Sequence, residues 1–543
     1  MKTIIKREKR LACVGFPCVN SLREAKTNIL NKLFIATILV AGLSVYSCSE
    51  RKDLLYDTAP GEGIAVRSAE TIPTATITID ENAVINDASK SMLGFNHAWG
   101  YWQMRVTMED GNTLNVSEDC INVLKSAGVR LPLNRMAGTD SQWMKWKEAI
   151  GPLADRTLQG NPKVKQRMGI VEWVTLVRRI DPDAEFVLVL NYELETPQDY
   201  ADLAEFLTGD GSVNINGGEN WAQKRIELGI TEPVKVAIWE LGNELDLKVN
   251  KYTPSYYIEK SLPAITAIKE VCPDAKFAAI GASAPWGGTR DWRGWNTAVL
   301  QGLGAQIDYL TFHPYYARVQ SAMNNMERYM NEMKQQILAS TGSDRIKLYI
   351  SEHGVWPTNL NDRSTWTQTH DLKGTLATGA FIGRLFKRSD VAYSTTHVFS
   401  GGPWGIIYRN GADNSRYTTG IAEMNNAFYN AVGEKVIKTS LAGKDTVNLE
   451  TTAMLTSKGM NLVIFNLDPD KKRDLKFKYS SDDAYRLVKE VIVTADALNA
   501  YNTFGNKKIT TTETLLSDHN AFTKYLMPEK SMVVLYLEEK PAE

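Results

Sequence analysis

Residues 234–244 read VKVAIWELGNE, an apolar run that ends in polar and acidic residues. The run is continuous rather than alternating, which is typical of a parallel strand buried on both faces. Seven further strands are predicted, most of them of the same kind: Met92–His97, Val129–Leu133, Phe186–Asn191, Phe277–Ala282, Tyr309–His313, Leu348–Glu352 and Thr395–Ser400. Eight such strands with helices between them, over roughly 340 residues, favour a (β/α)8 TIM barrel over an open doubly wound sheet.

In most of the segments between these strands, apolar residues recur at the spacing of an α-helix. The predicted helices are Ser117–Ala127, Met168–Arg179, Pro197–Leu207, Ser255–Val271, Ser321–Leu338, Leu372–Lys387 and a final helix Thr418–Val432.

The pattern changes after about residue 435. Short alternating strands at Leu462–Asn466, Val488–Val493 and Met532–Leu537 predict an all-β accessory domain, a sandwich. The strand Ala75–Asp80 precedes the barrel and is expected to join that sandwich. The predicted organisation is a signal segment (1–47), a tether (48–75), a sandwich strand (76–90), a catalytic barrel (91–434) and a β-sandwich (435–543).

The N-terminal segment predicts export. Leu33–Val45 is a 13-residue apolar run, too short to span a membrane and typical of a signal-peptide core. It is followed by Cys48 and a polar stretch, which resembles a bacterial lipoprotein signal. That resemblance implies lipid modification of Cys48 and membrane contact through the lipid anchor only; an ordinary signal peptide is the alternative. We therefore expect an exported protein, either an outer-membrane or cell-surface lipoprotein or a periplasmic one.

Charge and cysteine content exclude several classes of protein. Lys and Arg number 62 against 63 Asp and Glu, a formal net charge of −1, so a basic nucleic-acid-binding protein is not expected. Apart from Cys13, Cys18 and Cys48, the cysteines are Cys120 and Cys272, far apart in sequence. Whether they pair stays open, and no metal-binding spacing is present. We expect no metal and no organic cofactor, and the sequence leaves the oligomeric state open.

The chemistry is expected at the C-terminal ends of the barrel strands, where TIM barrels carry their active sites. Glu244 follows the fourth predicted strand, Glu352 ends the seventh, and His313 ends the sixth between them. Two carboxylates facing one crevice are what a glycosidase needs, one as general acid/base and one as nucleophile. The neighbouring Glu240 is expected to be a buried, paired carboxylate of the strand itself.

Several stretches resemble glycoside hydrolases of clan A. Trp239–Glu244 (WELGNE) is similar to the acid/base motif of the whole clan. Trp146–Arg156 (WKEAIGPLADR) and Ala500–Phe504 (AYNTF) resemble family 51, the α-L-arabinofuranosidases, as do Asp308–Tyr316 (DYLTFHPYY) and Pro528–Leu537 (PEKSMVVLYL). The similarity covers roughly residues 76–540.

The resemblance implies roles for individual residues. Glu244 would be the general acid/base, Glu352 the nucleophile, and Asn243 would bind the sugar 2-hydroxyl. His313 and Tyr315 would line the site, with Tyr315 hydrogen-bonded to the nucleophile. The implied supporting residues are Arg130, which would orient the nucleophile, and Trp356, which would form a wall of the sugar site.

The sequence also departs from the family. Where the family has Glu-His after strand one, this chain has Asn96-His97, so the grip on a furanose is expected to be weakened or redirected. Arg135 adds a positive charge after strand two. It could pair a carboxylate or contact the substrate, and in the second case an acidic sugar becomes possible.

Further cleft candidates lie on the loops that follow the strands. Asn191 follows strand three, and aromatic residues follow strands one, five and eight: Trp99, Tyr101, Trp102, Trp286, Trp292, Trp295 and Trp404. Aromatic faces on these loops suit stacking against sugars.

The expected activity is a retaining glycoside hydrolase that releases α-L-arabinofuranosyl residues from plant polysaccharides by double displacement. The expected partner is therefore a carbohydrate, without nucleic acid. One alternative is an endo-acting clan A glycanase on another glycan. The other is a catalytically silent glycan-binding surface lipoprotein, against which the presence of both carboxylates argues.

Overall fold

The computed structural model describes residues 72–98, 107–110, 113–137, 144–160, 163–248, 250–287, 291–409, 415–444, 446–481, 485–517 and 520–540. All of these except 286–287 belong to one compact unit. The predicted signal segment and Cys48 lie outside the described residues, as do Trp99, Tyr101 and Trp102. Within the described ranges, no helix combines the length and apolar character needed to cross a membrane.

Eight parallel strands close into a barrel. They are β2 (Gly94–Ala98), β5 (Leu133–Ala137), β8 (Glu185–Val189), β9 (Val236–Glu240), β10 (Phe277–Ile280), β11 (Tyr309–Thr311), β13 (Lys347–Val355) and β14 (Val391–Thr396). Each pairs with the next in parallel, and β14 pairs with β2 to complete the circle. The TIM-barrel prediction is confirmed.

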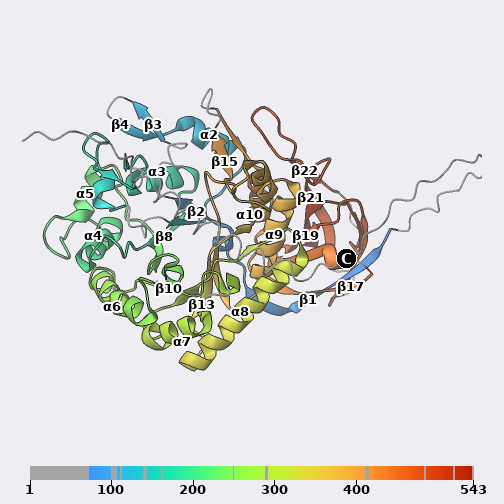
Figure 1. Cartoon of the computed structure of the whole chain (residues 1–543). Helices are drawn as coiled ribbons and strands as arrows, with labels where there is room; N and C mark the ends of the chain where they lie inside the picture. Colours follow the sequence, from blue (N-terminus) through green and yellow to red (C-terminus); the bar gives the residue numbers. More distant parts are fainter. Residues whose placement is uncertain are drawn as a thin grey trace, which may run out of the picture. The chain divides into compact units, whose positions relative to one another are not determined.

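Helices surround the barrel strands (Figure 1). Their bounds are α2 Glu118–Ser126, α3 Ile170–Ile180, α4 Pro197–Thr208, α5 Trp221–Glu227, α6 Pro254–Val271, α7 Trp292–Leu303, α8 Gln320–Thr341, α9 Leu372–Phe386 and α10 Gly420–Ala431. Short strands form small hairpins or extend the barrel sheet: β3 Thr107–Asp110, β4 Thr113–Val116, β6 Leu158–Gln159, β7 Val164–Lys165, β12 Tyr315–Tyr316, β15 Ile407–Arg409 and β16 Arg416–Thr418.

Helix α7 was expected to be a loop that presents tryptophans to a cleft. Instead, Trp292 and Trp295 are buried in the helix, each 7% exposed. The indole Nε1 of Trp295 donates to the carbonyl of Ile280, at the end of β10, over 3.0 Å. These two rings therefore pack the helix against its neighbours and do not line a carbohydrate cleft.

The barrel interior changes from apolar to charged along the strands. Leu133, Val187, Ile238, Ala278 and Tyr349 form one buried apolar cluster. Because side chains of a strand repeat every two residues on the same face, the next inward positions of β5 and β9 are Arg135 and Glu240. The apolar layer thus supports a charged layer nearer the C-terminal ends of the strands.

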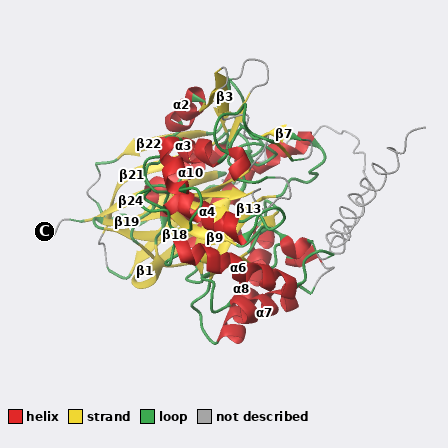
Figure 2. Ribbon diagram, turned by 90° about the vertical axis from the view of Figure 1, so that its left-hand side faces the viewer, coloured by secondary structure: helices red, strands yellow, loops and turns green. Residues whose placement is uncertain are grey.

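The C-terminal region forms a β domain around one nine-stranded sheet. Besides β1 (Thr74–Asp87), its strands are β17 Lys435–Gly443, β18 Leu449–Thr456, β19 Gly459–Asn466, β20 Arg473–Tyr479, β21 Tyr485–Thr494, β22 Thr510–Leu515, β23 Lys524–Met527 and β24 Ser531–Glu539. Strand β1 lies between β17 and β20, the position expected for a strand that precedes the barrel but belongs to this domain. Figure 2 shows β1 on the same side of the molecule as β19, β21, β22 and β24.

The sheet of the β domain curls on itself. The Tyr525 hydroxyl of edge strand β23 donates to Glu490 of β21, near the opposite edge, over 2.9 Å. Residues from both halves, including Phe477 of β20 and Leu537 of β24, share one apolar core. This arrangement agrees with the predicted sandwich.

Helix α9 joins the barrel to the β domain. Gly379 faces Phe465 of β19, and a Cβ added to this glycine would lie 2.5 Å from the ring. One turn further on, the Thr452 hydroxyl donates to the carbonyl of Gly383 over 3.0 Å, and Arg384 pairs with Glu450 at 2.8 Å. The close approach of the helix to the sheet therefore requires a residue without a side chain at position 379.

We expect Gly379→Val to lower the free energy of unfolding by about 2–3 kcal/mol, because the added side chain overpacks a buried contact. Phe465→Ala alone is expected to cost about 3–5 kcal/mol. In the double variant, the missing ring makes room for the valine, so the combined loss should be smaller than the sum of the two. Urea unfolding of the three variants and wild type measures this, and strictly additive losses would contradict the predicted contact.

Candidate functional site

The turn that follows β9 directs two polar side chains into the mouth of the barrel. Gly242 has φ +88°, and a Cβ there would lie 2.7 Å from a methyl carbon of Leu245. Glu244 has φ +49° and ψ +29°, a left-handed conformation that is uncommon for a residue other than glycine. The reversal between them places Asn243 and Glu244 just beyond the charged layer.

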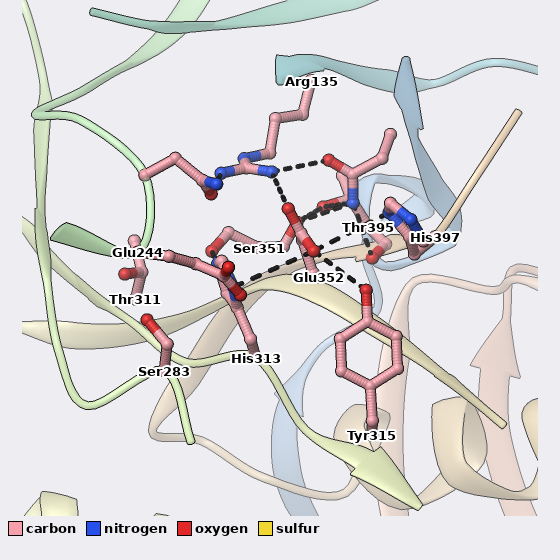
Figure 3. Close-up of polar contacts among 12 residues, drawn as sticks. Arg135, Glu244, Ser283, Thr311, His313, Tyr315, Ser351, Glu352, Thr395 and His397 are labelled. Atoms are coloured by element: carbon pink, nitrogen blue, oxygen red, sulfur yellow. Dashed lines mark hydrogen bonds and ion pairs between the residues drawn. The ribbon is translucent and has the colours of Figure 1, made fainter. Parts of the chain in front are cut away.

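Strand β13 carries the second carboxylate. Glu352 is buried, with 8% of its side chain exposed. Its Oε1 accepts from Arg135 Nη1 over 2.8 Å, and its Oε2 accepts from the Tyr315 hydroxyl over 2.9 Å. Both oxygens are thus held by donors from other strands, which fixes the orientation of the carboxylate (Figure 3).

Arg135 is the centre of the charged layer. Its Nε and Nη2 bind the two oxygens of Glu240 at 2.6 and 2.7 Å. Nη2 also donates to Asn243 Oδ1 at 2.6 Å, and Nη1 donates to Asn96 Oδ1 and Glu352 Oε1, both at 2.8 Å. A guanidinium has five N–H groups, and these five contacts use all of them. Arg135 therefore pairs carboxylates of the charged layer, and no N–H group of its guanidinium is left to contact an acidic sugar.

Asn96 is also occupied by the barrel itself. Its Nδ2 donates to the carbonyl of Ser351 over 2.8 Å, while its Oδ1 accepts from Arg135. The side chain is fully buried. This asparagine, in the middle of β2, therefore supports Arg135, and both the oxygen and the nitrogen of its amide are engaged within the protein.

His313 lies between the two carboxylates. Its Nδ1 is 2.9 Å from Glu244 Oε1 and 3.9 Å from Glu352 Oε2, and its Nε2 is 2.8 Å from the Ser351 hydroxyl. Glu244 is the more open carboxylate, with 34% of its side chain exposed. Figure 3 shows Glu244 and His313 on one side of Glu352, with His397 on the other.

An aromatic cluster borders the same mouth. Tyr315 packs edge-on against Trp356 at 5.3 Å and near Trp404 at 5.5 Å, while His397 lies 5.1 Å from Trp404. Trp356 is 40% exposed. Trp404 is anchored by its Nε1, which donates to the carbonyl of Val355 over 2.6 Å. Trp356 thus packs against Tyr315, the residue that binds Glu352, and is itself partly open to solvent.

The surroundings push the pKa values of this cluster apart. Burial tends to raise the pKa of Glu352, but the charges of His313, His397 and Arg135 and the Tyr315 hydrogen bond lower it to about 2. Burial tends to lower the pKa of His313, but the charge of Glu352 and the contacts with Glu244 outweigh burial and raise it. For His397 burial dominates, and the pKa is lowered.

Three residues predicted for the site lie away from the carboxylate pair. Arg130 is exposed, and its guanidinium lies 5.7 Å from the ring centre of Tyr429. Strand β5 begins only at Leu133, so Arg130 precedes the strand and Arg135 makes the contact with Glu352 that was assigned to Arg130. His97 is fully buried, bonds Asn134 at 2.9 Å and stacks on Phe399.

Asn191 is the third of them. Its Oδ1 accepts from the backbone of Glu193 and Leu194, and its Nδ2 donates to the carbonyl of Met144. These contacts stabilise the turn after β8. Trp99, the remaining candidate, lies outside the described residues.

His397 was missed from the sequence. It directly follows β14, the eighth barrel strand, and its Nδ1 lies 3.7 Å from Glu352 Oε2. Its position just after a strand end was the available signal, but that strand was predicted four residues too late.

Among the described residues, Glu244, His313 and Glu352 also form a group with a spacing that suits a metal ion, with ligand atoms within 4.8 Å of one another.

Part of the chain is similar to known arabinofuranosidases. Residues 121–335 match a family model described as an α-L-arabinofuranosidase 1 domain. Two similar relatives are named intracellular exo-α-(1→5)-L-arabinofuranosidases. That of Streptomyces lividans is 23% identical over 205 residues (37% of this chain, 30% of that protein), and that of Acetivibrio thermocellus is 26% identical over 255 residues (45% and 48%). The chain spans less than half the length of either relative.

Solved structures agree on the fold. The GH51 arabinofuranosidase of Xanthomonas axonopodis pv. citri superposes with a TM-score of 0.71 at 16% identity, over 86% of this chain and 100% of that one. At this identity the likeness concerns the fold alone.

The comparisons contradict the predicted export. Five curated relatives carry the word intracellular in their names. The expectation of an outer-membrane, cell-surface or periplasmic protein, drawn from residues outside the described ranges, was therefore wrong.

The sequence matches and the shared fold confirm the resemblance inferred from the WELGNE, WKEAIGP and AYNTF stretches. The chain is similar to family 51 glycoside hydrolases of clan A in its sequence over residues 121–335 and in its fold.

Proposed function

We propose that this chain is a retaining exo-acting α-L-arabinofuranosidase, with Glu352 as nucleophile and Glu244 as general acid/base. The observation that carries the proposal is the separation of the two carboxylates. One carboxylate oxygen of Glu244 lies within 4.8 Å of one carboxylate oxygen of Glu352. Retaining glycosidases hold their carboxyl groups about 5–5.5 Å apart, whereas inverting ones need about 6.5–9.5 Å to admit a water molecule.

The surroundings support Glu352 as the nucleophile. A nucleophilic carboxylate must be ionised and rigidly aimed. The lowered pKa of Glu352, about 2, keeps it ionised at neutral pH. Arg135 and Tyr315 each hold one of its oxygens, so rotation of the carboxylate is restricted.

The position of Glu244 supports a role in proton transfer. Its side chain is more exposed than that of Glu352, so it can reach both a leaving group and an incoming water. The His313 imidazole orients it through the 2.9 Å contact to Oε1. Two carboxylates with such different environments are suited to two different roles.

The reaction then follows in two steps. Glu352 attacks the anomeric carbon and displaces the leaving oxygen, which takes a proton from Glu244; a glycosyl ester on Glu352 remains. A water molecule then gives its proton to Glu244 and attacks the same carbon, which releases the sugar and restores Glu352. The Oδ1 atom of Asn243 is bound to Arg135, so its amide N–H groups can donate to the sugar 2-hydroxyl, next to the anomeric carbon.

The choice of sugar rests on the relatives. Their names specify exo-acting release of α-L-arabinofuranosyl groups. Trp356, which is 40% exposed and packs against Tyr315, suits stacking on a sugar ring of an arabinose-bearing glycan. The engagement of every Arg135 donor within the protein favours a neutral sugar over an acidic one.

Glu352→Ala should lower kcat on an aryl α-L-arabinofuranoside by about 10⁴-fold or more, because no other group can form the glycosyl intermediate. Glu244→Ala should lose about 10²–10⁴-fold on substrates with poor leaving groups. In kcat/KM, which reports the first step, it should lose far less on a dinitrophenyl glycoside, because that leaving group needs no proton to depart. Glu513→Gln, on the β domain, is the matched carboxylate control and should keep wild-type rates.

The stereochemistry of the first product tests the mechanism itself. Proton NMR of the sugar released by wild type should show retention at the anomeric carbon. Inversion would contradict the double displacement. Lack of turnover on a panel of aryl glycosides, with glycan binding kept, would leave a binding protein instead.

Tyr315→Phe removes one hydrogen bond to the ionised form of Glu352 and should therefore raise its pKa. A group with a lowered pKa is ionised above that pKa, so the acid limb of kcat/KM should move to higher pH, by about one pH unit. Tyr316→Phe is the matched control, since that hydroxyl lies 3.3 Å from His353 and does not contact Glu352. Equal acid limbs in wild type and Tyr315→Phe would show that this contact does not set the ionisation of Glu352.

A further inference from the structure

One carboxylate of the charged layer takes no part in the proposed reaction steps. Glu240 is the last residue of β9 and is fully buried. Both of its oxygens bind Arg135, at 2.6 Å to Nε and 2.7 Å to Nη2. A buried ion pair is often no more stabilising than apolar residues of similar volume, so stability alone is a weak reason for this one. A role in the chemistry of the site is a stronger reason.

Arg135 divides its contacts unequally between two carboxylates. Glu240 receives two of its N–H groups, whereas Glu352 receives one, from Nη1 over 2.8 Å (Figure 3). The other hydrogen of Nη1 goes to Asn96. Burial tends to lower the pKa of Arg135, but the charge and hydrogen bonding of Glu240 raise it, ahead of the charge of Glu352. The guanidinium charge is thus committed first to Glu240.

This division of charge affects the reactivity of Glu352. Arg135 and Glu240 offset each other, so the negative charge of Glu352 is not cancelled by the pair. Without Glu240, the full charge of a guanidinium that is 0% exposed would act on Glu352 alone. An adjacent opposite charge lowers the pKa of a carboxyl by about 1–3. The nucleophilicity of a group falls when its pKa falls, so this carboxylate would attack more slowly.

The other neighbours of Glu352 already stabilise its ionised form. The Tyr315 hydroxyl donates to Oε2 over 2.9 Å, and the Nδ1 atoms of His313 and His397 lie 3.9 and 3.7 Å from the same oxygen. All three groups, like Arg135, favour the carboxylate over the carboxylic acid. An undivided guanidinium charge would add to this stabilisation and weaken the nucleophile further.

We propose that Glu240 is a positioning residue of the proposed reaction, which keeps Glu352 nucleophilic by holding the charge of Arg135. The inference rests on the proposed function. It gives Glu240 opposite effects on the two steps. Attack of Glu352 on the anomeric carbon is faster with Glu240 in place, and the resulting sugar ester is hydrolysed more slowly, because a more basic carboxylate is a poorer leaving group.

Glu240→Gln removes the charge at nearly the same volume and tests this split. On a dinitrophenyl α-L-arabinofuranoside, kcat/KM reports formation of the glycosyl ester, and kcat reports its hydrolysis when a burst of dinitrophenol precedes the steady state. We expect kcat/KM to fall about 10–100-fold, following the lower basicity of Glu352. The value of kcat should stay unchanged or rise. A merely structural defect would lower both.

Further variants test whether Glu240 acts through Arg135. In an Arg135→Gln background, Glu240→Gln should cost nothing more in kcat/KM, because no charge is left to hold. Glu240→Asp, which keeps the charge, should recover part of the loss. Asp468→Asn is the matched control: it unpairs Arg473, an arginine of the β domain that is also 0% exposed, and should keep wild-type rates.

Circular dichroism and thermal unfolding check the fold of each variant. If Glu240→Gln does not fold, the comparison of Arg135→Gln with the double variant still decides the question. A further loss of kcat/KM in the double variant would contradict a role through Arg135.

A measurement without turnover separates this inference from the proposed function. Alkylation of Glu352 by a small epoxide, followed by peptide mass spectrometry, reports the nucleophilicity of this carboxylate directly. We expect labelling about tenfold slower in Glu240→Gln than in wild type. That result in a protein without glycosidase activity keeps the control of Glu352 by Glu240 and overturns the proposed function. Glycosidase activity with equal losses in kcat and kcat/KM, or with labelling at the wild-type rate, overturns the role of Glu240 alone.

Discussion

The buried pair of Arg135 and Glu240 is the interaction on which the site depends. A guanidinium without solvent exposure must have every N–H group bonded, and here the five partners come from Glu240, Asn243, Asn96 and Glu352. Through these contacts one side chain of β5 links β2, β9 and β13. The removal of Arg135 would leave Glu240 buried and unpaired, at a cost of about 3–5 kcal/mol. The geometry of the proposed nucleophile therefore rests on the same ion pair that stabilises the barrel mouth.

The barrel could be predicted because most of its strands are buried on both faces and therefore read as continuous apolar runs. The second strand was placed four residues too early for the same reason. Val129–Leu133 is rich in apolar residues, whereas β5, Leu133–Ala137, carries Asn134 and Arg135 in its middle. A strand that turns polar side chains into a barrel looks like a loop in a hydropathy pattern. This shift explains why the contact with Glu352 was assigned to Arg130.

The site could be predicted in part for a related reason. Glu244, Glu352, His313 and Tyr315 each follow or end a strand predicted from the sequence, so the predicted strand ends were enough to bring them together. The contacts of Asn96 with Arg135 and of His397 with Glu352 join strands far apart in sequence, and a single sequence carries no signal for such pairings. Asn191 fulfils the same strand-end rule but bonds the backbone of its own turn and of Met144, which only the structure distinguishes from a cleft residue.

The left-handed backbone at Glu244 has a consequence for evolution and engineering. A residue with a side chain is held there against a steric preference of about 1–2 kcal/mol, in a conformation that glycine adopts without strain. A glycine at this position would relax the turn while it removes the carboxylate. Stability and the proposed activity thus oppose each other at one residue, and selection for heat resistance alone would tend to discard the proposed acid/base group. Attempts to stabilise the enzyme should therefore leave the 242–245 turn unchanged.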